Sequence, residues 1–501
     1  MDRHTRMDGL TRREFVNLLL AAGVASQVRC TEDDDNDPLR NATQSTAFDT
    51  TGLTLMARMA QLTDTHTTDS LSPARFAVAA GLTRSAWRPY EAYSTQIVDG
   101  IVRTINRIHA SGRNIDFVLH TGDLIDNDHG NELDWMLAVM DGRSVNPLSG
   151  PDDRGLIRPA SLLDPFATYA ASGLYRNGVH GPQPSIPWYV LPGNHDIYAM
   201  GLLAYQDIPF AGRIVQLPTV PGSDVILPTF LNPVDSYGYG AVTPANPGPP
   251  NLGLRSFVAP NGARRYLSKQ EFIRAMFSTI TGPAGHGFVS GDDGPSWYSA
   301  SPAPGLRIIG GDTTDHLNQL SGIIYVDGCI SAPQLDFIRA ELQAAQSADE
   351  IVILATHHPS GYLREVYGTA ATPESLRMLL NQYSNVVVHL CGHSHRNHVT
   401  DRGGYLEIET SATIDLPQEG RLLEIYRDNS TGKPAVAYEM FPYVDPAVPP
   451  LGEDPLESLR SAAFAIATNE SGGAARQKMF DESEADPRGS RADRVGLWKA
   501  S

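Results

Sequence analysis

Asp64 and His66 are the first side chains along the chain whose types and spacing suit metal binding. They follow a mostly apolar stretch that ends at Leu62. They are two residues apart, so on an extended strand both side chains would point to the same face. A carboxylate and an imidazole together suit a borderline cation such as zinc, iron or manganese. One Asp-x-His pair is not specific, but similar polar clusters recur further along the sequence.

Four more polar clusters follow apolar stretches, which predict strands at 115–119, 186–191, 351–355 and 386–390. Ligands bind outside the carboxyl ends of strands in open α/β sheets, so we expect all the clusters at one sheet edge. Their candidate functional side chains, in chain order, are Asp123, Asn194, His195, Asp196, His357, His393 and His395.

Together the clusters supply three oxygen ligands and four imidazoles, enough for two adjacent cations about 3.5–4 Å apart. One carboxylate must then bridge the cations, and a water or hydroxide can complete the site. Structural metal sites are usually Cys-rich and local in sequence, and this set is neither. His195 stands beside the set and could face a substrate instead of a metal. The expected ligands are Asp64, His66, Asp123, Asn194, His357, His393 and His395.

Strands and helices alternate between the clusters, which predicts an α/β fold. A helix is predicted at 90–110, where four isoleucines recur at helical spacing. The strand–helix–strand order implies a right-handed crossover that places Asp123 beside Asp64. Further helices are predicted at 331–344 and 375–383, and further strands at 306–310, 322–326, 404–410, 421–427 and 434–441.

The N-terminal segment is typical of an export signal. Arg12 and Arg13 precede a short apolar run, as in twin-arginine signals, and the run is too short to span a bilayer permanently. The alternatives are an amphipathic cytosolic helix and, at Cys30, a lipid anchor. We therefore expect a signal peptide at 1–30, a polar linker at 31–50, a catalytic domain at 51–445 with insertions at 141–185 and 199–300, and a polar C-terminal tail at 446–501.

The composition excludes several classes of partner. The chain has 501 residues and a formal net charge of −18, which argues against a nucleic-acid groove or an anionic membrane surface. Small phosphate-bearing substrates remain compatible, because bound cations can supply the positive charge. The three cysteines form neither a disulfide framework nor a Cys-rich metal site.

The order of the clusters resembles the calcineurin-like metallophosphoesterase family, within the binuclear metallophosphatase superfamily. The motifs that carry the resemblance are Asp-x-His at 64–66, Gly-Asp at 122–123, Gly-Asn-His-Asp at 193–196, His-His-Pro at 357–359 and Gly-His-x-His at 392–395. The resemblance covers residues from about 55 to 443. It implies a four-layer α/β/β/α sandwich of two mixed sheets flanked by helices, with long loop-rich insertions.

The resemblance also implies a role for each residue. Asp64, His66 and His395 would hold the first metal, Asn194, His357 and His393 the second, and Asp123 would bridge them. His195 would act on the substrate side, with Asp196 orienting its ring. His358 is an alternative to His357, and the metals are open among manganese, iron and zinc.

The expected activity is hydrolysis of small phosphomonoesters or phosphodiesters outside the cytoplasm, after passage through the twin-arginine translocation machinery. Two cations make hydroxide available as the nucleophile and clamp phosphate oxygens, while His195 protonates the leaving group. The alternative is a non-catalytic cell-envelope protein that retains the metal site.

Overall fold

The structure is a computed structural model. It describes residues 48–70, 72, 88, 90–149, 165–175, 184–198, 201, 225–229, 254–258, 261–316, 326–364, 369–442, 456, 459–460, 463–464 and 489–500. The predicted export signal, most of the linker and much of both insertions lie outside these residues, as does the strand expected at 322–326 apart from its last residue.

Two six-stranded sheets form the centre of the fold. The first runs in the order β16 (Val495–Lys499), β15 (Pro434–Pro442), β14 (Glu419–Asp428), β1 (Leu53–Leu62), β2 (Phe117–His120) and β5 (Trp188–Val190). The second runs in the order β12 (His398–Asp401), β13 (Leu406–Glu409), β11 (Val386–Cys391), β10 (Ile351–Ala355), β9 (Leu306–Gly310) and β8 (Tyr298–Ala303). Two small two-stranded antiparallel sheets pair β3 (Ser144–Val145) with β4 (Tyr169–Ala170) and β6 (Val225–Thr229) with β7 (Leu254–Val258).

Within each sheet, the strands that precede the polar clusters are parallel to one another and end level. In the first sheet, Leu62 at the end of β1 lies opposite His120 of β2, which itself lies opposite Val190 of β5. In the second sheet, Ala355 at the end of β10 lies opposite Leu390 of β11. Because parallel strands that end level deliver their following loops to one edge, the clusters are brought together as predicted.

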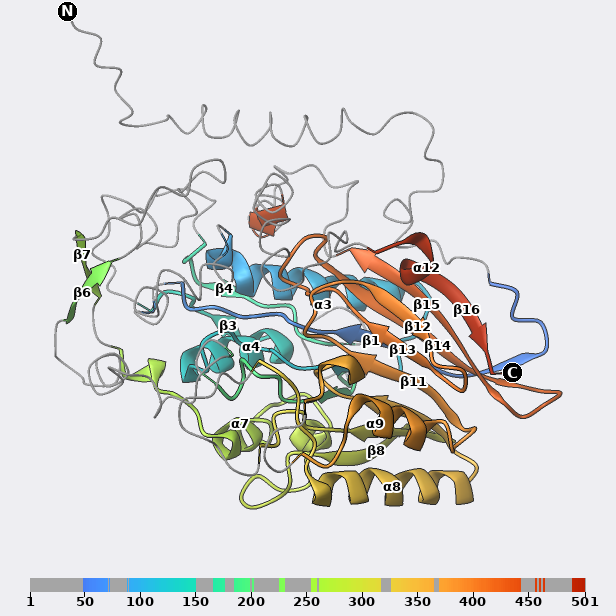
Figure 1. Cartoon of the computed structure of the whole chain (residues 1–501). Helices are drawn as coiled ribbons and strands as arrows, with labels where there is room; N and C mark the ends of the chain where they lie inside the picture. The colour runs from blue at the N-terminus through green and yellow to red at the C-terminus, as the bar shows by residue number, and fades with distance from the viewer. Residues whose placement is uncertain are drawn as a thin grey trace, which may run out of the picture.

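Helices cover both outer sides of the paired sheets. In Figure 1, α3 lies above the sheets and α8 below them. The helices are η2 (Glu91–Tyr93), α3 (Ser94–Ala110), α4 (Gly130–Asp141), η5 (Gly262–Arg264), α7 (Lys269–Ala275), η6 (Ala284–Gly287), α8 (Ala332–Ser347), η7 (Ser360–Tyr362), α9 (Pro373–Leu380) and α12 (Arg491–Arg494). The fold is thus a mixed α/β sandwich of two large sheets flanked by helices, in agreement with the expected class.

The hydrophobic core explains this layering. One continuous cluster of buried side chains joins both sheets to α3 and α4, and a second lies between β9–β11 and the helices α8 and α9. The isoleucines at 97, 101, 105 and 108 are all buried, which confirms the helix predicted at 90–110. The start of α9 is fixed by a capping box in which Thr372 and Ser375 satisfy each other's backbone N–H groups.

The C-terminal end departs from the sequence prediction. Residues 446–501 were expected to form a polar tail, but β16 pairs antiparallel with β15 and becomes the edge strand of the first sheet. Arg494, just before it, is held by two hydrogen bonds of 2.6 Å to the buried carboxylate of Glu419. A strand of five residues after a long polar stretch carries too little alternation to be predicted.

The second insertion is also more regular near its end than the sequence indicated. Residues 261–300 contain α7, which opens with a capping box between Ser268 and Glu271, and the start of β8.

Among the helices of the described residues, none has the length and apolar character needed to cross a membrane.

Candidate metal centre

The loops that follow β1, β2, β5, β10 and β11 carry all the predicted ligands to one sheet edge. The side chains of Asp64, His66, Asp123 and His357 are almost completely buried there, whereas His395 retains 26% of its side-chain exposure. Buried carboxylates and imidazoles need compensating partners, so the distances between them show whether a cation could fit among them.

Asp64, His66 and His395 form the first group. His66 Nε2 lies 3.2 Å from His395 Nε2, and His395 Nε2 lies 3.2 Å from Asp64 Oδ1. The remaining distance, from His66 Nε2 to Asp64 Oδ1, is 3.8 Å. One ligand atom from each of the three residues therefore points at a common position.

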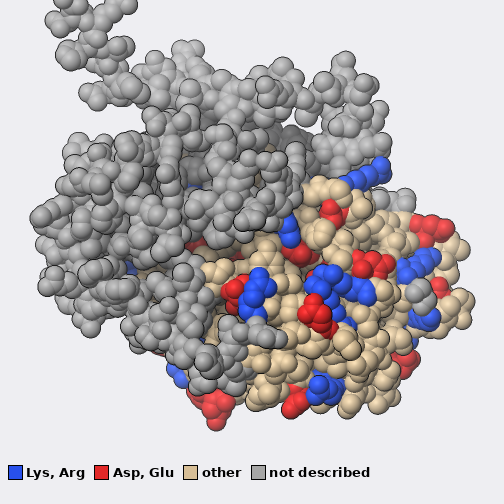
Figure 2. All heavy atoms as spheres, viewed as in Figure 1, with Lys and Arg blue, Asp and Glu red and all other residues tan. Residues whose placement is uncertain are grey.

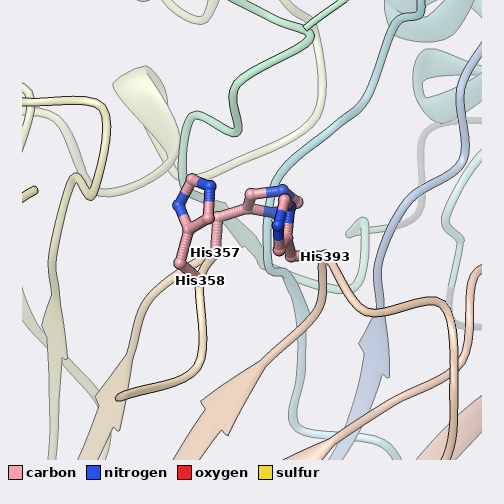
Figure 3. A group of neighbouring side chains, drawn as sticks. All are labelled: His357, His358 and His393. Atoms are coloured by element: carbon pink, nitrogen blue, oxygen red, sulfur yellow. The ribbon is translucent and has the colours of Figure 1, made fainter. Parts of the chain in front are cut away.

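Asn194, His357 and His393 form the second group. His357 Nε2 lies 3.0 Å from Asn194 Oδ1, and the ring centroids of His357 and His393 are 5.2 Å apart. Figure 3 shows His357 and His358, which follow β10, beside His393, which follows β11. One ring nitrogen of each of these three histidines lies within 4.8 Å of the others.

Asp123 lies between the two groups. Its Oδ2 is 3.2 Å from His357 Nε2 in the second group and 3.7 Å from His66 Nε2 in the first. Its Oδ1 accepts a hydrogen bond of 2.8 Å from the backbone N–H of His195. This position between the two groups suits the bridging role predicted for Asp123.

The donor atoms fit metal ions. Two ligand atoms about 2.1 Å from a shared cation stand roughly 3–3.5 Å apart, and the distances of 3.2 Å within the first group match this spacing. In the second group, the Nδ1–H of His357 donates to the backbone oxygen of Thr121 at 2.9 Å, so Nε2 of the neutral ring is an acceptor. This Nε2 faces two further acceptors, Asn194 Oδ1 and Asp123 Oδ2. Buried acceptors that face one another need a positive charge between them.

The pKa values reflect the same excess of negative charge. Burial lowers the pKa of His357, but Asp123 outweighs this effect and raises it to about 9. Burial likewise lowers the pKa of His395, and Asp64 raises it to about 10. The centre therefore attracts cations, and in the metal-free chain protons take that place.

The other nitrogen of each first-group histidine faces a carboxylate. His395 Nδ1 donates to Asp415 Oδ2 at 2.7 Å, and His66 Nδ1 lies 2.8 Å from Asp126 Oδ1. In the second group the outer atoms bind the backbone instead, because Asn194 Nδ2 donates to the carbonyl oxygen of Gly201 at 3.0 Å. These contacts fix which ring nitrogen and which amide atom face the centre.

The backbone at the centre is held in unusual conformations. Positive φ angles occur at five of the predicted ligands: Asp64 (50°), His66 (40°), Asp123 (53°), His393 (68°) and His395 (54°). The prediction that Asp64 and His66 share a strand face is wrong in this detail, because both lie in the loop after β1. Such strained conformations concentrate at functional sites.

A glycine is required beside Asp123. A Cβ atom on Gly193 would lie 2.1 Å from Asp123 Oδ1 and 2.4 Å from the Asp123 backbone nitrogen. Only a residue without a side chain permits this approach of the β5 loop to the β2 loop.

The contacts of His358 separate it from His357. His358 Nδ1 lies 2.7 Å from the hydroxyl oxygen of Thr313, and His358 Nε2 donates to the carbonyl oxygen of Val326 at 3.0 Å. Both ring nitrogens are thus engaged by other parts of the chain. His357 keeps one nitrogen facing Asp123 and Asn194, which favours His357 as the ligand.

Asp196 does not contact the ring of His195, contrary to the prediction. Its carboxylate accepts three backbone hydrogen bonds, from Leu124 (2.8 Å), Ile125 (3.1 Å) and Gly193 (2.8 Å). It therefore ties the loop after β2 to the loop after β5. The ring of His195 is oriented by Asp126, whose carbonyl oxygen accepts a hydrogen bond of 2.8 Å from His195 Nδ1.

Three residues around the centre were not assigned from the sequence: Asp126, Asp415 and Arg88. Asp126 stands three residues after Asp123, so its position next to a predicted ligand was an available signal. Asp415 and Arg88 carried no signal, because they are 20 and 22 residues from the nearest predicted ligands and belong to no motif.

Residues 57–231 match the family model described as calcineurin-like phosphoesterase. This stretch of the chain is therefore similar to calcineurin-like phosphoesterases. The match includes the clusters of Asp64, Asp123 and Asn194, and the structure adds those of His357 and His393 to the same centre. Together they indicate a hydrolase of phosphoric ester bonds with a binuclear metal centre.

Several solved structures resemble this chain distantly. A dimetal phosphatase from Danio rerio is 13% identical, with 78% of this chain and 98% of that chain covered and a TM-score of 0.37. A Staphylococcus aureus protein described as a 5′-nucleotidase is 13% identical, with coverages of 80% and 57% and a TM-score of 0.32. The anchor in the inner membrane complex of Plasmodium is 11% identical, with coverages of 76% and 87% and a TM-score of 0.28. These TM-scores are too low to carry a functional argument, and no curated protein sequence matches the chain.

Proposed function

We propose that the protein is an exported hydrolase that removes phosphate groups from small phosphomonoesters or cleaves small phosphodiesters. The observation that carries this proposal is the position of Asp123, whose Oδ2 lies within 3.7 Å of a ligand nitrogen in each of the two groups. A carboxylate shared in this way is suited to a pair of cations that act together on one substrate.

The cations would acidify a water molecule and neutralise the charge that develops on the phosphate oxygens. The protein holds their ligands in place before any substrate binds. Hydrogen bonds to Asp415, Thr121 and Gly201 fix the lone pairs of His395, His357 and Asn194 toward the centre. The preorganised site therefore needs little rearrangement during the reaction.

His195 is suited to protonate the leaving group. Its ring lies at 4.5 Å from the ring of His66, and its side chain is 15% exposed. Because Nδ1 donates to the carbonyl oxygen of Asp126, Nε2 is the nitrogen left for a substrate oxygen, and it carries a proton when the ring is in its cationic form. Burial lowers the pKa of His195, but Asp123 and Asp126 raise it overall, which favours the protonated ring.

The surface supports small substrates over nucleic acids. The formal net charge is −18. On the described part of the face drawn in Figure 2, acidic and basic side chains are interspersed and no wide basic band gathers. Nucleic-acid grooves depend on such a band for phosphate contacts.

The proposed activity is tested with metal-free protein that is reloaded with manganese, iron or zinc. We expect hydrolysis of p-nitrophenyl phosphate or bis-p-nitrophenyl phosphate only after reloading. His195→Ala should lower kcat about 100- to 10,000-fold while both cations remain bound. A protein that binds two cations and hydrolyses neither ester would contradict the proposal and favour a non-catalytic role.

Export is tested separately from activity. We expect replacement of Arg12 and Arg13 by lysine to leave the protein in the cytoplasm, because twin-arginine signals are recognised through this pair. Fractionation of cells that produce either form measures the distribution. Equal export of both forms would exclude the twin-arginine route.

A further inference from the structure

Arg88 makes a bidentate contact with a carboxylate beside the metal centre. Its Nε donates to Asp415 Oδ1 at 2.6 Å, and one terminal nitrogen donates to Asp415 Oδ2 at 3.1 Å. The Arg88 side chain is only 3% exposed. The hydroxyl of Tyr90 also donates to Asp415 Oδ1, at 2.9 Å. Asp415 is therefore held on both of its oxygens.

The same guanidinium faces a second carboxylate. The other terminal nitrogen of Arg88 lies 3.6 Å from Asp126 Oδ1, and the Asp126 side chain is completely buried. Both interactions raise the pKa of Arg88 above its usual value, although burial lowers it. One fixed positive charge thus lies between Asp415 and Asp126.

These two carboxylates stand behind three histidines of the site. Asp415 accepts the hydrogen bond of His395 Nδ1 at 2.7 Å, and Asp126 Oδ1 lies 2.8 Å from His66 Nδ1. Asp126 Oδ1 is also 3.3 Å from Nδ1 of His195. Arg88 therefore reaches both imidazoles of the first metal group through one carboxylate each.

Removal of Arg88 would leave two carboxylates without their shared counter-charge in a region that already holds Asp64 and Asp123. A buried carboxylate that loses its partner either moves or takes up a proton. In both cases the histidine beside it loses the contact that orients its ring, which is a hydrogen bond for His395 and a close approach of 2.8 Å for His66. Such outer contacts typically change metal affinity about 10- to 100-fold.

We propose that Arg88 is a positioning residue for the first cation, acting through Asp415 on His395 and through Asp126 on His66. The proposal deepens the proposed function and rests on it. His357 and Asn194 of the second group do not depend on these carboxylates, because His357 Nδ1 and Asn194 Nδ2 donate to the backbone oxygens of Thr121 and Gly201. The two cations should therefore respond differently to one substitution.

The test compares stepwise binding of zinc and of manganese to metal-free protein by calorimetry with a competing chelator. We expect Arg88→Gln to weaken one of the two steps about 10- to 100-fold and to leave the other within about threefold. Arg88→Lys should recover part of the lost affinity, because lysine restores the charge without the bidentate geometry.

Arg307→Gln is the matched control. Arg307 also lies between two carboxylates, at 2.5 Å from Glu341 and 2.6 Å from Glu350. Glu350 directly precedes β10, so this pair is at the opposite end of the strand from His357. Both binding steps should keep their wild-type constants in Arg307→Gln.

A double-mutant cycle with Asp415→Asn completes the test. If Arg88 acts through Asp415, the effect of the double variant on the weakened step should be clearly smaller than the product of the two single effects. Three results would overturn the proposal: single effects that are additive in binding free energy, wild-type binding in Arg88→Gln, or equal weakening of both steps. Should Arg88→Gln fail to fold, Arg88→Lys with Asp415→Asn provides the same cycle.

Binding is measured without substrate, so the outcome is separate from the proposed activity. A protein that binds two cations with the expected difference but hydrolyses no ester would retain the role of Arg88 and lose the proposed function. Hydrolysis that requires two cations, with no difference in binding, would retain the function and lose the role of Arg88.

Discussion

The two halves of the metal centre use similar ligands but hold them differently. In the first half, the outer nitrogens of His66 and His395 face the carboxylates of Asp126 and Asp415. In the second half, His357 and Asn194 donate to backbone oxygens. The first half is therefore oriented by charged side chains and the second by the backbone itself.

This difference has a physical consequence. A carboxylate behind an imidazole makes it a more basic ligand and adds negative charge, whereas a carbonyl oxygen fixes the ring with no net charge. The orientation of the first half can be altered by replacing a side chain. The hydrogen bonds that orient His357 and Asn194 in the second half can be altered only by moving the backbone. Substitutions near the centre should therefore affect cation binding in the two halves differently.

The largest expected effect comes from Asp123, the residue common to both halves. Asp123→Asn removes the shared charge and places an amide between His66 and His357, which lie 3.7 Å and 3.2 Å from Oδ2. We expect kcat/KM for the preferred ester to fall about 1,000-fold, the scale of lost transition-state electrostatics. Metal content should fall below two cations per chain. Full activity with both cations present would remove the bridging role.

A methyl group at Gly122 should disturb the backbone-held half selectively. Its Cβ would lie 2.7 Å from His357 Nδ1 and 2.9 Å from the backbone nitrogen of Gly193. We expect Gly122→Ala to lower kcat about 100-fold, because small displacements of catalytic groups have effects of this size. The measurement is steady-state kinetics together with cation binding.

Gly112→Ala is the control for backbone strain. The φ angles of Gly112 and Gly122 are 93° and 96°, but a Cβ at Gly112 meets nothing within 4 Å. Both variants share the conformational cost of about 1 kcal/mol in unfolding free energy, whereas only Gly122→Ala should lose activity. Equal losses in kcat would show that strain, and not contact with His357, is responsible.

His358→Gln should have a smaller effect on the site. Both ring nitrogens of His358 are engaged by Thr313 and Val326, so its loss affects packing and not metal ligation. We expect a drop of about 1–3 kcal/mol in unfolding free energy and two cations still bound. His357→Gln, in contrast, should lose a cation. Elemental analysis of both variants decides between the two histidines, and loss of a cation in His358→Gln would reverse the assignment.

The smallest expected effect on turnover is that of Arg494→Gln, at the far edge of the first sheet. Arg494 compensates the fully buried carboxylate of Glu419, so its removal should lower the unfolding free energy by about 3 kcal/mol. We expect kcat to be unchanged below the unfolding temperature, which calorimetry would locate. A loss of kcat without destabilisation would show that this edge of the sheet influences the geometry of the metal centre.

The structure brings the predicted ligands together, and the sequence could indicate this because they follow strong signals. Asp64, Asp123, Asn194, His357 and His393 each stand in a polar cluster directly after a buried strand, and parallel strands bring such clusters to one edge. The helix at α3 was predictable for a similar reason, since its isoleucines repeat at the helical period.

The outer contacts could not be predicted because they depend on loop paths. Asp196 follows His195 directly, which suggested a ring contact, but consecutive side chains in this turn diverge and Asp196 binds three backbone N–H groups. Arg88 and Asp415 are separated by 327 positions and meet only in the folded chain. β16 was missed because its pairing with β15 depends on an edge that the sequence alone does not reveal.

Hydrolysis of phosphoesters by two cations joined by Asp123 is the proposed reaction. It is tested most directly by adding manganese or zinc stepwise to metal-free protein while hydrolysis of the preferred p-nitrophenyl ester is followed. We expect turnover to reach its plateau at two cations per chain in the wild-type protein and to stay at background in Asp123→Asn. Turnover that is equal in metal-free protein, or complete at one cation per chain, would contradict it.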